Sequence, residues 1–82
     1  NFDHENTENL FKIFGMLENE AKSLIDKKLS LPAYDQCLKA SHVFNILDAR
    51  GVISVAQRAE YIARIRDITK GAAEIWVSTQ TK

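Results

Sequence analysis

The stretch that decides the fold is residues 32–57, PAYDQCLKASHVFNILDARGVISVAQ, because it holds one helix and the start of another. Pro32 suits the first turn of a helix, where a missing N–H costs no hydrogen bond. Apolar side chains then recur at helical spacing, namely Ala33, Cys37, Ala40, Phe44 and Leu47. Gly51 follows where a left-handed C-terminal cap is favoured. The pattern predicts a helix over about 32–50.

Ser54 and Gln57 have the spacing of a capping box, in which each side chain bonds the other residue's backbone N–H. A further helix is therefore predicted over about 55–77, with residues 78–82 expected to fray. Its apolar stripe consists of Tyr61, Ile62, Ile65, Ile68, Thr69, Ala72, Ile75 and Trp76.

Upstream, a helix is predicted over about 8–28, with Thr7 or Asn6 as its N-cap. Its apolar face follows the same three-and-four spacing and consists of Leu10, Phe11, Phe14, Leu17, Ala21, Leu24 and Ile25.

The fold class is therefore all-α, a single domain over 1–82 made of a three-helix unit (about 8–28, 32–50 and 55–77) with antiparallel or steeply crossed neighbours. No segment shows the two-residue alternation of a strand. Three helices with such wide apolar faces are expected to leave one face uncovered, which the rest of a longer parent protein or a partner would fill.

Length and composition exclude several classes of protein. With 82 residues and 9.3 kDa there is room for one small core. Eleven basic residues balance 11 acidic ones, which gives no global electrostatic reason to bind nucleic acid or a membrane. No apolar run approaches the roughly 18 residues of a membrane helix. The only methionine is Met16, so we expect the chain to be a segment of a longer protein.

Metal and thiol chemistry are not indicated. Cys37 and His42 are five residues apart, about 140° around a helix, and so cannot share a ligand cluster. Cys37 falls on the apolar seam, where a thiol ordinarily packs as a small hydrophobe. No metal site and no cofactor site is predicted.

Acid–base catalysis is not indicated either. Glu18 and Glu20 are expected to project from polar faces, and Glu60 with Arg64 has the i,i+4 spacing of a solvated ion pair. No residue is predicted to be catalytic.

The unusual polar residues lie between positions 41 and 58. Ser41, Asn45 and Asp48 form a ridge beside the apolar seam, whereas Arg58 falls near the middle of an apolar stripe, where arginine requires a partner. We predict that Arg58 meets Asp48 or Asn45 and fixes how the two helices cross. The alternative role is contact with a ligand, RNA or subunit. Candidate contact residues are Ser41, His42, Asn45, Arg50 and Arg58.

Local charge is uneven. Residues 50–70 carry five basic side chains against two acidic ones, net +3, and residues 1–20 carry one against five, net −4. Such polarity could serve an RNA backbone, although interspersed acids favour a solvated helical face.

Two runs, 31–35 (LPAYD) and 38–55 (LKASHVFNILDARGVISV), closely resemble the C-terminal helical region of the alpha subunit of bacterial heterotetrameric glycyl-tRNA synthetase. The stretches around residues 1–14 and 58–66 are similar to the flanking parts, so the resemblance covers nearly the whole chain. Small departures occur at Val43, Val52, 36–37 and 56–57.

The resemblance implies a cytoplasmic parent enzyme with two alpha and two beta subunits, which activates glycine with ATP and Mg²⁺ and esterifies it to tRNA. Its class II catalytic domain would lie upstream, and no position here matches the motifs that bind ATP or glycine. This segment is expected to be non-catalytic and to support domain packing, the subunit interface or tRNA approach. A competing hypothesis is a free-standing helical adaptor that binds a partner helix.

Overall fold

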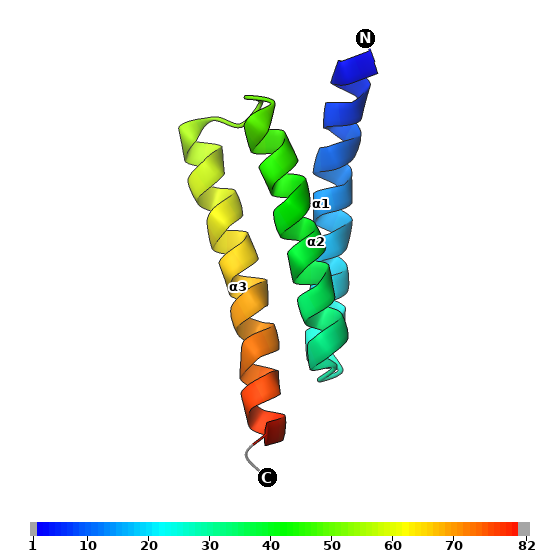
Figure 1. Cartoon of the computed structure of the whole chain (residues 1–82), viewed down its shortest axis with the longest axis vertical. Coiled ribbons are helices and arrows are strands. Elements are labelled where there is room, and N and C mark those ends of the chain that lie inside the picture. Colours follow the sequence, from blue (N-terminus) through cyan, green and yellow to red (C-terminus); the bar gives the residue numbers. More distant parts are fainter. Residues whose placement is uncertain (1, 81–82) are drawn as a thin grey trace.

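The computed structural model describes the backbone of residues 2–80 and the side chains of residues 7–79 (Figure 1). Helix α1 spans Phe2–Asp26, α2 spans Ser30–Ala49 and α3 spans Val55–Gln80. Helices α1 and α3 run in the same direction and α2 runs opposite to both. No strand occurs in residues 2–80, so the predicted all-α three-helix unit with antiparallel neighbours is confirmed.

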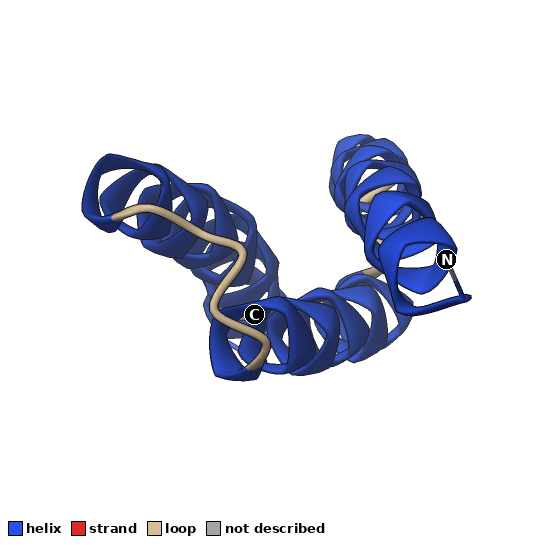
Figure 2. Cartoon of the chain, turned by 90° about the horizontal axis from the view of Figure 1, so that it is seen from above, coloured by secondary structure: helices blue, strands red, loops and turns tan. Residues whose placement is uncertain are grey.

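Seen along its length, the bundle has its helices at the corners of an open triangle (Figure 2). Helix α2 packs extensively on both of the others, whereas α1 and α3 meet less extensively. Ala33, Cys37 and Ala40 let neighbouring backbones approach α2 closely, because their side chains are small and fully or almost fully buried. The buried apolar core is completed by Phe14, Ala21, Val43, Phe44, Leu47, Ile68 and Ala72.

Helix α1 begins at Phe2 and not near residue 8. The prediction that Thr7 or Asn6 is the N-cap is therefore wrong, because both residues lie within the helix.

The same helix ends at Asp26, two residues earlier than predicted, because Lys28 adopts a left-handed conformation with φ 61°. The Lys28 N–H bonds the Ile25 carbonyl at 2.9 Å and the Leu29 N–H bonds the Leu24 carbonyl at 2.9 Å. This pair of bonds is the Schellman arrangement, which satisfies the last carbonyls of a helix.

Helix α2 begins at Ser30, so Pro32 lies inside its first turn and not at its first residue. The first intrahelical bond runs from the Ala33 N–H to the Leu29 carbonyl at 3.1 Å. Pro32 precedes this bond and thus costs none. The Ser30 hydroxyl donates across to the Ala72 carbonyl of α3 at 3.0 Å, which fixes this end of α2 on α3.

The α2–α3 turn forms as predicted. Gly51 has φ 70° and donates its N–H to the Asp48 carbonyl at 3.0 Å. The Ser54 N–H bonds Gln57 Oε1 at 3.0 Å and the Gln57 N–H bonds Ser54 Oγ at 3.1 Å, so both halves of the capping box are made. Helix α3 then continues to Gln80, so the expectation that the chain frays from residue 78 is wrong for residues 78–80. Residues 81–82 of that tail lie outside the described residues.

The predicted apolar faces of α1 and α2 are buried or half-buried, but that of α3 is not uniform. Ile62 and Trp76 lie at its edge and remain 38% and 45% exposed. Part of the apolar stripe of α3 is thus uncovered in the bundle, and what covers it stays a prediction. Within residues 2–80, no helix combines the length and hydropathy that spanning a bilayer requires.

Candidate interaction surface

Arg58 contacts Asp48, which is one of the two partners predicted for it. Its Nη2 lies 2.7 Å from both carboxylate oxygens of Asp48, and its Nε lies 3.2 Å from Oδ1. Such a forked contact fixes direction as well as distance. Asn45 is exposed and takes no part in this contact.

The surroundings of this pair differ from the prediction. Arg58 was expected in the middle of the apolar stripe, but its side chain is 56% exposed and that of Asp48 is 31% exposed. By the helical spacing of about 100° per residue, Arg58 falls on the same line as Trp76, at the edge of the stripe that faces α2. The arginine is therefore not misplaced.

The other candidate residues do not gather at one place. Ser41 is half-buried on the side of α2 that faces α3, whereas His42 lines a shallow hollow against α1 with Ile13 and Leu17. Arg50 donates a long 3.5 Å hydrogen bond to the hydroxyl of Thr7 in α1. The five residues therefore do not form a single binding site.

The sequence reading missed the most buried ion pair of the described residues. Glu18, expected on a polar face, is only 7% exposed and receives the guanidinium of Arg64, with Nε 3.0 Å from Oε2. The hydrogen bonds from Arg64 outweigh burial and lower the pKa of Glu18, and the same bonds raise the pKa of Arg64. The guanidinium carbon also lies 5.0 Å from the ring centre of Phe14 and 4.8 Å from that of Tyr61.

A signal for this pair exists in the sequence. Glu18 stands four residues after Phe14 and three before Ala21, both of which belong to the apolar face of α1. Arg64 likewise stands three residues after Tyr61 and four before Ile68, both of which belong to the apolar stripe of α3. An acidic residue inside one apolar stripe and a basic residue inside another indicate a buried ion pair, because a charged side chain is rarely buried without a partner.

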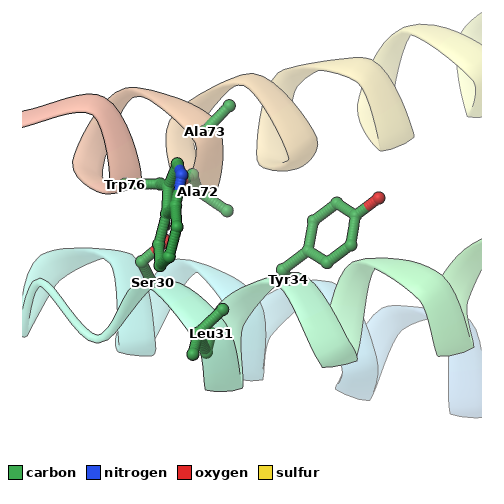
Figure 3. A pocket seen from close by; sticks show the side chains of 6 residues that line it. All are labelled: Ser30, Leu31, Tyr34, Ala72, Ala73 and Trp76. Carbon is green, nitrogen blue, oxygen red and sulfur yellow. Dashed lines mark hydrogen bonds between the residues drawn. The ribbon is translucent and has the colours of Figure 1, made fainter. Parts of the chain in front are cut away.

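An apolar hollow of about 240 Å³ lies between the start of α2 and the end of α3 (Figure 3). Trp76 reaches from α3 over Ser30, and the ring of Tyr34 stands farther along α2 with its hydroxyl directed away from Trp76. Leu31, Ala72 and Ala73 complete the lining.

The thiol and the acidic groups offer no reactive arrangement. Cys37 is buried, which raises the pKa of its thiol despite an opposing hydrogen bond from Thr69. A buried thiol with a raised pKa is a poor nucleophile. Across the described residues, no three His, Cys, Asp or Glu side chains come together in a way that could hold a metal ion.

The structure is a three-helix bundle with part of its apolar surface exposed. Comparison with known families places the chain among the aminoacyl-tRNA synthetases, which are ligases of protein biosynthesis. The model of the glycyl-tRNA synthetase alpha subunit family matches residues 1–81, so the chain belongs to that family. The resemblance carried by residues 31–55 is thereby confirmed.

Proposed function

We propose that this chain is a non-catalytic helical part of the alpha subunit of glycine–tRNA ligase, and that it provides a surface on which the beta subunit packs. In this proposal ATP, Mg²⁺ and glycine bind to a catalytic domain upstream in the same alpha subunit. The assembly contains two alpha and two beta subunits and acts in the cytoplasm. Family membership argues against a free-standing adaptor unrelated to aminoacylation.

The observation that carries the proposal is the exposure of large apolar side chains on the α2 and α3 side of the bundle. Tyr34 and Trp76 are 44% and 45% exposed, and Leu31 is 65% exposed, although all three line one hollow. Clustered apolar side chains that a bundle leaves in water mark a protein interface.

Direct tRNA binding is less well supported. Phosphate contacts require free cationic side chains. Two of the five basic residues between 50 and 70 are already paired with a carboxylate outside this stretch, Arg58 with Asp48 and Arg64 with Glu18. The net charge of +3 in this stretch therefore overstates the cations available to an RNA.

The experiment compares the intact alpha subunit with one that lacks this helical unit. We expect the shortened subunit to keep glycine-dependent adenylate formation and to lose the complex with the beta subunit, measured by size-exclusion chromatography with light scattering. A shortened subunit that still forms the full complex would overturn the proposal. Loss of adenylate formation with retained beta binding would instead place the unit in support of the catalytic domain.

A further inference from the structure

The hollow between Trp76 and Tyr34 continues along α3. A second, more open hollow is lined by Ile62, Ile65, Thr69 and two basic residues of α3, and it shares Ala73 with the first. The two hollows meet at Ala73 and form one surface, called the α2/α3 groove, although α2 borders only the first hollow and the second lies on α3 alone. The groove is defined by Leu31, Tyr34, Ile62, Arg66, Lys70, Ala73 and Trp76.

The dimensions of the α2/α3 groove suit a helix. The groove runs along α3 from Ile62 to Trp76. These two residues are 14 positions apart, which is about 21 Å or four helical turns at 1.5 Å per residue. Ala73 lies where the two hollows meet, so its small side chain allows a partner backbone to approach closely. The larger Tyr34 and Trp76 stand on either side of the first hollow (Figure 3).

The basic side chains beside the α2/α3 groove differ from the other arginines of α3 in having no ion-pair partner among the described residues. Arg66 and Lys70 are exposed at its edge and have no ion-pair partner within residues 7–79. Arg58 and Arg64 of the same helix are each paired with a carboxylate. No acidic side chain lines either hollow, so the groove offers two free cations beside an apolar floor.

We infer that the α2/α3 groove binds an amphipathic helix of the beta subunit, whose apolar stripe packs over Ala73 and Trp76 and whose bordering carboxylates meet Arg66 and Lys70. This inference rests on the proposed function. An apolar stripe matches the floor, and carboxylates match the unpaired cations. An RNA backbone fits less well, because it would leave the apolar floor uncovered and find only two free cations.

The test uses the full-length alpha subunit and a fluorescently labelled beta subunit. Ala73→Trp places a large side chain where the two hollows meet. We expect it to weaken binding of the beta subunit about tenfold or more. The matched control is Ala63→Trp, which makes the same change at an exposed position of α3 that lines neither hollow. The thermal melts of both variants by circular dichroism establish that the helices remain folded.

Charge is tested by the double variant R66Q/K70Q, which we expect to weaken binding about three- to thirtyfold. Its control, K12Q/K27Q, removes the same charge from two exposed positions, one in α1 and one in the turn that follows it. Added salt should weaken the wild-type complex more than the R66Q/K70Q complex, because the charges at the edge of the groove are screened.

The possible results distinguish failure of the proposed function from failure of the groove assignment. If the wild-type alpha subunit does not bind the beta subunit through this unit at all, both the proposed function and the groove assignment fail. If binding occurs but Ala73→Trp and R66Q/K70Q bind as tightly as their controls, only the groove assignment fails. If these variants keep the beta subunit and lose tRNA, the occupant is RNA and the inference is overturned.

Discussion

Arg64 of α3 binds Glu18 of α1 with a forked contact, although the two residues are 46 positions apart. The carboxylate is almost fully buried and the guanidinium side chain is 32% exposed. The pair therefore joins the two helices that otherwise meet least, α1 and α3, at the middle of the bundle. One turn away, Phe14 and Tyr61 pack edge to face at a centroid distance of 4.8 Å. The ion pair and this aromatic contact together fix the register of α1 against α3.

Removal of either partner should destabilise the bundle. We expect Glu18→Gln and Arg64→Met each to lower the free energy of unfolding by about 2 kcal/mol, less than a fully buried pair would cost because Arg64 is partly solvated. Methionine retains much of the aliphatic packing against the two aromatic rings. Urea denaturation of both variants and of the double variant measures the coupling free energy between the residues.

The control for this cycle is Glu60→Gln. Glu60 also approaches Arg64, with 4.0 Å between Oε2 and Nη1, but its side chain is 68% exposed. An exposed i,i+4 pair contributes about 0.3–0.5 kcal/mol. A loss at Glu60 as large as that at Glu18 would contradict the assignment of the stability to burial.

The Glu18 contact also predicts how stability depends on pH. The pKa of Glu18 is lower in the folded protein than its ordinary value of 4.5. Its contribution is thus fully present above pH 4.5 and is lost as the pH falls through the lower, folded pKa. Urea midpoints of wild type and Glu18→Gln, measured from neutral pH downward, should differ most above pH 4.5 and converge below it. A constant difference across this range would exclude ionised Glu18 as the source.

The sequence was sufficient to predict three helices and the connection between α2 and α3, but not where α1 begins or how it ends. The apolar seam of α2, the left-handed Gly51 and the Ser54–Gln57 capping box follow from residues within one or two turns of each other. Asp48 with Arg58 was also accessible, since the pair spans ten residues across a short turn.

What the sequence alone did not predict depends on which faces of distant helices meet. The helical spacing places Glu18 in the face of α1, but only the packing of α1 beside α3 brings Arg64 to it. Likewise, Ile62 and Trp76 have the spacing of core residues and remain exposed, because α2 covers the stripe of α3 only in part. Periodicity defines a helical face and leaves open how much of it a neighbour covers.

Two glycines within helices should respond differently to alanine. At Gly15 an added Cβ would meet no atom within 4 Å, so Gly15→Ala should stabilise the protein by about 0.5–1 kcal/mol through reduced backbone entropy. At Gly71 the added Cβ would lie 3.0 Å from Ile25 Cδ1, so Gly71→Ala should gain less or lose stability. Thermal melts of the two variants give the comparison, and an equal gain would show that Ile25 moves aside freely.

Cys37 should be protected from thiol reagents in the folded protein. Its side chain is 2% exposed and burial raises the pKa of the thiol, so both access and the thiolate fraction are reduced. We expect reaction with a disulfide reagent to be slow in buffer and to accelerate with urea in parallel with unfolding. Because Cys37 is the only cysteine, the signal has a single source. A fast reaction without urea would mean that α2 separates readily from α3.

The Arg58–Asp48 pair should orient the α2–α3 turn while contributing little to stability. Since Arg58 is more than half exposed, Arg58→Ala is expected to lower the free energy of unfolding by no more than about 1 kcal/mol. Arg58→Lys should restore only part of this loss, because an ammonium group cannot make the forked contact. In the full-length enzyme, Arg58→Ala should leave affinity for the beta subunit close to that of wild type. If it melts like wild type and yet loses beta-subunit or tRNA binding, Arg58 is a contact residue and the structural role of the pair is wrong.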